Sequence, residues 1–489
     1  MKKTALFMLL ALSMMSGPAY AAPSVKISSS EVVVTESAAN EFLTQMKAAD
    51  FSQARLKLKD VSDEELAKIC AACPGISMLE IDSKGLTSIK PLAGLTKLAK
   101  FRLRAESVQD MTPLAKLTGL QELNITNKAM GPDLKWMAGL TNLKVIDIFA
   151  GPALTSFEGL PSLASLAAVR LGGAIPADLT PILSLSGVRR VELTGCTIAD
   201  LTPLTKLPAL ADLSLYGCTV KDFSPLANCP KLRKLTYYAT KGSDYSTLGK
   251  LTQVTELKGG MTKLDNISWV ASLPNLKTFD VFSEYVADYS PLIKTGVEDF
   301  QIWDMRVPVG DLSAVGQIKS LKKLTLWSVN GAANSKALAG LTNLEKFRIS
   351  SDYNKKGGEP FDCAAAEGWG KVTEIEIAGA ALANTDKLAK ATRLKRMKLQ
   401  KLAGEVSLSF LGKMTSLTFL EIDQSKVKDF DALAGCTGLT SIKLNKVEGA
   451  ASLAALKKLP ALKSLTVNKG AFPDSELAGF GPQVKINQR

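Results

Sequence analysis

This chain contains a short repeat that occurs eighteen times, and six aromatic residues occupy the same outward position of that repeat. Rings at such regular spacing point to recognition chemistry. Sugar faces stack on such rings, and Trp and Tyr dominate the binding energy of many protein interfaces. Aromatic residues make up 6% of the chain, so eighteen equivalent positions should hold about one by chance. Six are found: Phe149, Tyr216, Tyr238, Phe282, Trp303 and Trp327. We expect a ligand-binding aromatic stripe; the alternative is that the rings pack on one another and stiffen the structure.

Polar side chains flank this aromatic stripe and are suited to hydrogen-bonding sugar hydroxyls or to pairing with a basic partner. They are Asp147, Glu192, Asp280, Gln301 and Asp304. Two carboxylates at a suitable separation could also hydrolyse a glycan. Carboxylates on a repeat surface are usually only solvated, so a carboxylate-dependent glycan-active enzyme is our third hypothesis.

The chain has 489 residues and no histidine. This absence excludes His-based general bases, Ser-His and Cys-His nucleophile pairs, and the commonest zinc ligand. No glycine-rich phosphate loop or serine-nucleophile elbow is present either. We therefore expect a protein that is not an enzyme and that needs no cofactor or metal.

The seven cysteines fit a structural role better than a redox one. Six of them occupy repeat positions of the core, and a free cysteine behaves as a small buried hydrophobic residue. A disulfide joining Cys70 to Cys73, or Cys196 to Cys218, stays open as an alternative. Because the number is odd, at least one thiol is unpaired within the chain, and Cys363 is the candidate.

The whole chain has a formal net charge of +13, and basic residues gather in its C-terminal third. The outward positions there hold Arg348, Lys395, Arg396, Lys398 and Lys443. Such a basic patch could bind an anionic polysaccharide, so an envelope-associated scaffold for anionic polymers is our second hypothesis. Lysines that merely keep a long surface soluble are an equally good interpretation.

A six-residue signature, apolar-x-x-apolar-x-apolar, predicts the elements that position these side chains. It occurs eighteen times from Ile76 to Leu462, in steps of 21 to 28 residues. In one unit, Leu210, Leu213 and Leu215 point inward from a short strand, and the position between the last two is polar in all eighteen copies. This period predicts an α/β solenoid of the leucine-rich repeat kind, with about nineteen coils. One parallel sheet should line its concave face, and short helical or 3-10 segments its convex face.

A second motif marks the return path of the coil. It begins with Asp and ends with Pro, as in Asp110 to Pro113, Asp178 to Pro181, Asp200 to Pro203, Asp222 to Pro225 and Asp288 to Pro291. The Thr or Ser before the proline predicts an N-cap, and proline suits the first helical position. These residues resemble bacterial leucine-rich repeats of the internalin type over roughly residues 76–489. The resemblance implies a curved surface that recognises a protein or glycan of a host or neighbouring cell.

The N-terminus resembles a secretory signal peptide over residues 1–21, with Lys2 and Lys3, an apolar stretch from Ala5 to Met15, and Ala19-Tyr20-Ala21 as cleavage site. We expect an exported, periplasmic or secreted protein without a transmembrane segment. Residues 22–50 should form a cap with a strand from Glu31 to Thr35 and a helix from about Ser37 to Ala48. Residues 51–489 should form the solenoid, with a loop insertion at 352–360.

Our first hypothesis is therefore an exported, non-enzymatic recognition protein. It would bind a protein or glycan of a cell surface or envelope on the aromatic stripe of the concave face. Nucleic acid is an unexpected partner for an exported chain.

Overall fold

The computed structural model describes residues 26–27, 31–35, 55–163, 166–173, 178–260, 264–282, 286–303, 312–327, 334–351 and 360–489. For 26–27, 31–35 and Phe282 it describes the backbone. The predicted signal peptide, the cap helix near residues 37–48, Asp304, and the insertion up to residue 359 lie outside these ranges.

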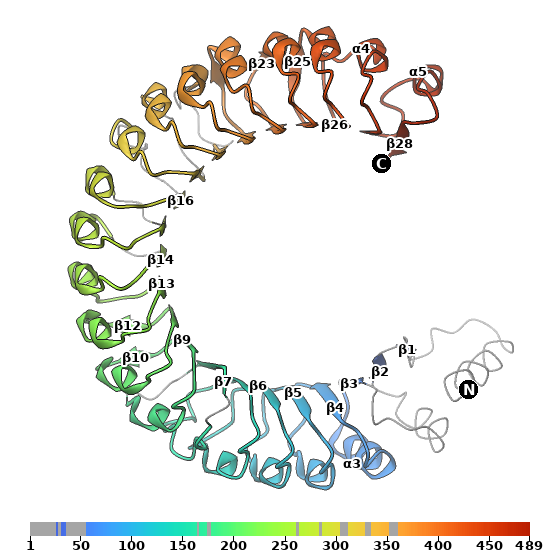
Figure 1. Cartoon of the computed structure of the whole chain (residues 1–489). Helices are drawn as coiled ribbons and strands as arrows, with labels where there is room; N and C mark the ends of the chain where they lie inside the picture. The colour runs from blue at the N-terminus through green and yellow to red at the C-terminus, as the bar shows by residue number, and fades with distance from the viewer. Residues whose placement is uncertain are drawn as a thin grey trace, which may run out of the picture. The chain divides into compact units, whose positions relative to one another are not determined.

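The chain forms two compact units. The first unit comprises residues 1–232 and 240–243, and the second unit comprises 233–239 and 244–489. In both units the coils contribute one strand each to the sheet, and most of them carry one short helical segment on the opposite side (Figure 1).

The strands of the first unit form a parallel sheet in chain order. It runs from β2 (Glu31–Thr35) through β3 (Arg55–Lys59), β4 (Met78–Asp82), β5 (Lys100–Ala105), β6 (Glu122–Asn127), β7 (Val145–Ala150), β8 (Ala168–Gly172) and β9 (Arg190–Thr194) to β11 (Asp212–Tyr216). Among the strands described in this unit, only β1 (Lys26–Ile27) pairs antiparallel, with β2. Each strand therefore lies in register between its predecessor and its successor.

The second unit repeats this arrangement. Its parallel sheet runs through β13 (Lys234–Tyr238), β14 (Glu256–Gly260), β15 (Thr278–Phe282), β16 (Asp299–Trp303), β17 (Lys323–Leu326), β18 (Lys346–Ser350), β20 (Glu374–Ala378), β22 (Arg396–Gln400), β24 (Phe419–Asp423), β26 (Ser441–Asn445), β27 (Ser464–Val467) and β28 (Lys485–Gln488). Strands of two or three residues also pair in the turns that follow the long strands. In the first unit β10 (Thr197–Ile198) pairs with β12 (Thr219–Val220). In the second unit β19 (Phe361–Asp362) pairs with β21 (Leu382–Ala383), and β23 (Glu405–Ser407) with β25 (Lys426–Lys428).

Short helical segments close most coils, whereas the described residues between β7 and β8 form none. In the first unit they are α3 (Asp63–Ala72), η1 (Lys90–Gly94), η2 (Thr112–Lys116), η3 (Lys135–Met137), η4 (Thr180–Ser184), η5 (Thr202–Lys206) and η6 (Ser224–Asn228). In the second unit they are η7 (Tyr245–Lys250), η8 (Ser268–Ser272), η9 (Ser290–Lys294), η10 (Val315–Gln317), η11 (Ser335–Gly340), η12 (Cys363–Gly368), η13 (Thr385–Lys390), η14 (Ser409–Lys413), η15 (Phe430–Gly435), α4 (Ala454–Lys457) and α5 (Asp474–Ala478).

The return-path motif positions its helix differently from the prediction. Thr112 is the first helical residue rather than a side-chain cap, and Pro113 follows it. The carboxylate of Asp110 accepts the backbone N–H of Thr112 at 2.8 Å, and its counterparts in four later coils do the same. Asp supplies the acceptor because its side chain reaches the amide two residues on. The Thr112 hydroxyl and N–H both donate to Asp110 and lower the pKa of its carboxyl group.

The core lies between the sheet and the helical segments, as the signature predicts. The inward residues Leu213 and Leu215 are fully buried, and so are Leu204 and Leu210 of the same coil. Aromatic side chains fill the core of the second unit, where Tyr237, Phe279 and Phe300 are buried. All seven cysteines are buried free thiols in this structure, so the prediction that six of them occupy core positions is confirmed, and Cys363 is buried as well.

Candidate functional site

The sheet face of each unit presents its outward side chains in columns that run across the strands. Parallel register sets equivalent residues of neighbouring coils side by side, about 4.8 Å apart. In the second unit the middle column holds Lys258, Asp280, Gln301, Thr325, Arg348, Glu376, Lys398, Glu421 and Lys443. The aromatic column beside it holds Tyr238, Gly260, Phe282 and Trp303, and continues to Trp327.

The predicted aromatic stripe is divided between the two units. Phe149 and Tyr216 lie on the sheet face of the first unit; Tyr238, Trp303 and Trp327 lie on that of the second. Phe149 is 45% exposed, and the other four rings are half-buried. None of these five described rings enters the core.

The Phe149 ring extends over the next coil, which has a glycine, Gly172, in the equivalent position. A Cβ atom on Gly172 would lie 2.5 Å from Cδ2 of the Phe149 ring. The glycine thus makes room for the ring on the sheet face of the first unit.

Trp303 and Trp327 form a stack in the second unit. Their ring centroids are 4.9 Å apart and their planes are inclined by 17°. The guanidinium carbon of Arg348, one strand further along, lies 4.2 Å from the Trp327 centroid. Because β16 and β18 flank β17, the two neighbours cover opposite faces of Trp327. This ring therefore offers its edge, rather than a face, to a ligand.

Asp280 lies beside this tryptophan stack. The Trp303 indole N–H donates to its carboxylate, and one carboxylate oxygen, Oδ1, is buried without a hydrogen-bond partner. Burial raises the pKa of Asp280 to about 6, although the positive charge of Lys258 acts in the opposite direction. The middle column thus contains one acid that takes up a proton at a higher pH than an ordinary aspartate does.

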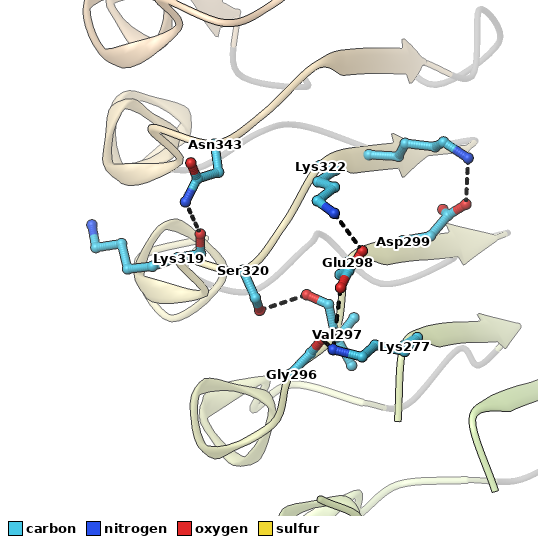
Figure 2. Close-up of polar contacts among 10 residues, drawn as sticks. Lys277, Gly296, Val297, Glu298, Asp299, Lys319, Ser320, Lys322 and Asn343 are labelled. Atoms are coloured by element: carbon cyan, nitrogen blue, oxygen red, sulfur yellow. Dashed lines mark hydrogen bonds and ion pairs between the residues drawn. The ribbon is translucent and has the colours of Figure 1, made fainter. Parts of the chain in front are cut away.

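The other acids near the stack are held by lysines of adjacent coils. Figure 2 shows Glu298 between Lys277 and Lys322, with N···O distances of 3.1 and 2.7 Å, and Asp299 is 3.4 Å from Lys323. Hydrogen bonds from the two lysines, that of Lys322 first, lower the pKa of Glu298. Such a carboxylate stays ionised and is a poor general acid.

Hydrogen bonds from the turns hold this part of the sheet in place. The hydroxyl of Ser320 donates to the carbonyl of Val297 at 2.6 Å, and the amide of Asn343 donates to the carbonyl of Lys319 at 2.9 Å (Figure 2). Each bond joins neighbouring coils just before their strands begin, so the backbone beneath the tryptophan stack is fixed.

The predicted flanking residues of the first unit are joined by one arginine. Arg170 contacts Asp147 at 3.2 Å and Glu192 at 2.8 Å. Asn124 also donates to Asp147 at 2.8 Å. Gln301 is half-buried in the middle column of the second unit, and Asp304 lies outside the described residues.

The residues of the predicted basic patch are interleaved with acids. Arg348 forms an ion pair with Glu376, and Lys398 lies 3.5 Å from the same carboxylate. Arg396 and Lys443 instead lie 4.2 and 5.6 Å from the centroid of the Phe419 ring, and Lys395 is exposed. Two of the five positive charges, those of Arg348 and Lys398, are therefore paired with an acid within the sheet face.

Sequence reasoning missed this alternation of charge along the columns and the Arg348 cover over Trp327. The alternation was visible in the sequence, because the middle-column positions read Arg348, Glu376, Lys398, Glu421 and Lys443 in successive coils. The contact of Arg348 with the Trp327 ring could not be found from the sequence, because it depends on the direction in which the arginine side chain points.

Among the described residues, no group of three or more Cys, Asp or Glu side chains is arranged to hold a metal ion. In the same part of the chain, no helix is both long enough and apolar enough to cross a bilayer.

No protein-family model matches the chain, and no curated protein matches it. Among solved structures, it is similar to an internalin from Listeria monocytogenes, with 18% identity over 75% of this chain and 89% of that chain and a TM-score of 0.38. It is similar to a leucine-rich repeat protein from Leptospira interrogans, with 14% identity over 87% and 97% and a TM-score of 0.41. A third is the ectodomain of a plant receptor kinase from Arabidopsis thaliana in complex with Casparian strip integrity factor 2, with 17% identity over 88% and 56% and a TM-score of 0.40.

The chain is a leucine-rich repeat solenoid. Its own strand register and inward apolar positions establish this.

Proposed function

We propose that this chain is a non-enzymatic recognition protein, exported through the signal peptide predicted at residues 1–21. Its ligand is a protein that contacts the edges of Trp303 and Trp327 on the sheet face of the second unit. The observation that carries the proposal is the ordered, half-buried tryptophan stack beside Arg348 and Asp280. Trp and Arg are the residue types most enriched at binding hot spots.

The covered faces of Trp327 favour a protein over a glycan. A sugar ring stacks on an open aromatic face, and both faces of Trp327 are occupied by neighbouring side chains. A rigid stack also loses little conformational entropy on binding, which suits a protein interface.

The two other hypotheses have less support. An anionic polymer would meet Glu376 and Glu421 among the basic residues, so the patch is not a continuous positive field. A glycan-active enzyme needs a second suitable carboxylate near Asp280, and the neighbouring Asp299 and Glu298 are paired with lysines.

Replacing Trp303 and Trp327 with alanine, one at a time, tests the proposal. We expect each change to weaken ligand binding by about 30-fold, which corresponds to about 2 kcal/mol at a hot spot. The ligand is sought with the mature chain on a glycan array and by pull-down of surface proteins. Binding is then measured by calorimetry and melting by fluorescence. Lowered melting with unchanged affinity would instead assign the rings a purely stiffening role.

Arg348→Ala separates protein from glycan recognition. The substitution uncovers one face of Trp327, so a stacking sugar should bind the variant as well as the parent or more tightly. A protein that contacts the ordered edge of the stack should bind it more weakly. Lys346→Ala, on the same strand and two residues away, is the matched control for loss of a positive charge.

A further inference from the structure

Two cysteines occupy the same position in adjacent coils of the first unit. Cys196 follows β9 and Cys218 follows β11, and each precedes one strand of the β10–β12 pair. Thr197 pairs directly with Thr219 in parallel register. The backbone N–H of Thr219 also donates to the carbonyl of Cys196 at 2.7 Å. The two Cys residues are therefore opposite one another across neighbouring turns.

The sulfur atoms of this pair are unusually close. Their separation is 2.9 Å, whereas non-bonded carbon atoms, which are smaller, are at their optimum about 3.5–4.0 Å apart. A disulfide bond is about 2.05 Å long and joins Cα atoms about 4.4–6.8 Å apart, a range that includes the spacing of adjacent parallel strands. Two thiols so placed need only a small side-chain movement to become bonded.

Other buried cysteines make different contacts. The thiols of Cys229 and Cys436 donate to carbonyl oxygens of Leu204 and Leu411 at 3.7 and 3.0 Å. Burial does not distinguish Cys196 and Cys218, since all seven cysteines are buried; the close contact of their sulfur atoms is what carries the inference.

We propose that Cys196 and Cys218 are a modification site at which an oxidant of the disulfide class forms an intramolecular crosslink between two coils. One cysteine thiolate attacks a sulfur of the oxidant and gives a mixed disulfide, and the second cysteine displaces the oxidant's remaining thiol. In sum, two protein thiols and one oxidant disulfide become one protein disulfide and two oxidant thiols. Two electrons and two protons pass to the oxidant.

The two thiols share one hydrogen bond, in which either sulfur can be the donor. The thiol that accepts this bond ionises more readily, because the bond stabilises its thiolate, and that thiolate attacks the oxidant.

Burial determines when the crosslink forms. Cys196 is 2% exposed and Cys218 is fully buried, so an oxidant reaches them while the coils close or during local opening. Once formed, the bond is shielded from reductants by the same packing. It links the turns that follow β9 and β11, and β11 ends with Tyr216 of the aromatic stripe.

Counting thiols in the full mature chain tests this proposal. The chain is refolded with oxidised glutathione as the oxidant, unfolded in guanidinium with an alkylating reagent, and weighed by mass spectrometry. The chain has seven cysteines, so we expect five alkyl groups after oxidation and seven after reduction. Peptide mapping should find Cys196 joined to Cys218. Seven alkyl groups after oxidation, or a link between other cysteines, would overturn the proposal.

The double variant Cys70→Ala/Cys73→Ala is the matched control. It keeps five cysteines, so three alkyl groups are expected after oxidation if the crosslink joins Cys196 to Cys218. Five alkyl groups would place the bond at Cys70 and Cys73 and contradict the assignment. Because the oxidised and reduced parent chains are compared directly, the result does not depend on whether a Cys196 variant folds, nor on the ligand proposed above.

Discussion

Asp280 and Glu298 lie on neighbouring coils, yet the pKa values of their carboxyl groups are shifted in opposite directions. Burial raises the pKa of Asp280 to about 6, although the charge of Lys258 and the Trp303 N–H act in the opposite direction. At Glu298 the hydrogen bonds from two lysine ammonium groups dominate and lower the pKa. At the residue scale, the sheet face thus contains one acid that titrates near neutral pH.

Asp280 should impose a pH dependence on the second unit. Its folded pKa of about 6 exceeds its ordinary value of 3.8, so the folded state binds the proton more strongly. The unfolding free energy should then fall as pH rises from 3.8 through about 6. Tryptophan fluorescence should report a step with an apparent pKa of about 6, because Trp303 donates to this carboxylate. Asp280→Asn should remove that step and increase stability above pH 6 by on the order of 1–2 kcal/mol.

Asp299→Asn is the control for the Asp280 titration. The charge of Asp299 contributes to raising the pKa of Asp280, so this variant should keep the fluorescence step and move it slightly to lower pH. A parent chain whose fluorescence is flat from pH 4 to 8 would contradict the assignment.

At the scale of the strand, each outward charge has two lateral neighbours, and opposite charges alternate. Glu376 on β20 is the clearest case, since it lies between Arg348 on β18 and Lys398 on β22 and is only 8% exposed. Such a carboxylate depends on both cations to offset its loss of water. The alternation therefore stabilises the pairing of strands as well as shaping the surface.

Glu376→Gln should destabilise the second unit by about 1–2 kcal/mol. The estimate lies below the 3–5 kcal/mol typical of a broken buried pair because Arg348 and Lys398 keep much of their hydration. Glu374→Gln, on the same strand, removes a more exposed pair with Lys346 at 3.2 Å and should cost less than about 1 kcal/mol. Urea unfolding followed by tryptophan fluorescence measures both, since Trp327 lies against Arg348. Equal losses in the two variants would argue against the buried role of Glu376.

The strands could be predicted well from the sequence because their inward positions hold apolar residues at a regular spacing. Leu213 and Leu215 are buried and Ser214 lies between them on the outward side, as the signature requires. It also placed the aromatic residues in one column of each sheet. It did not predict that Arg348 covers Trp327 or that Asp110 rather than Thr112 supplies the helix-start acceptor. Both depend on side-chain directions between neighbouring positions, which periodicity does not encode.

At the scale of the whole molecule, coils interact with their nearest neighbours, so stability is local within each unit. Hydrogen bonds and core contacts join a coil to the ones before and after it. In such a solenoid the free energy of unfolding is a sum of coil and interface contributions, and a defect should spread only a few coils.

Ile125→Ala in the first unit tests this locality. Ile125 is fully buried on β6, and the cavity should cost about 2–5 kcal/mol. Hydrogen exchange should quicken in peptides covering β5 to β7 and stay unchanged in those covering β20 to β26. Uniform acceleration across both units would mean that the chain unfolds as a single cooperative body.

The alternating charges have a consequence for how the length of this protein can change. Excising the coil of β20 alone would set Arg348 beside Lys398 and Lys346 beside Arg396, so that like charges would repel in two columns at once. Excising the coils of β20 and β22 together would bring Arg348 next to Glu421 and restore attraction. The apolar core of this stretch would allow any whole number of coils to be removed or added. The order of charges instead favours changes of two coils at a time.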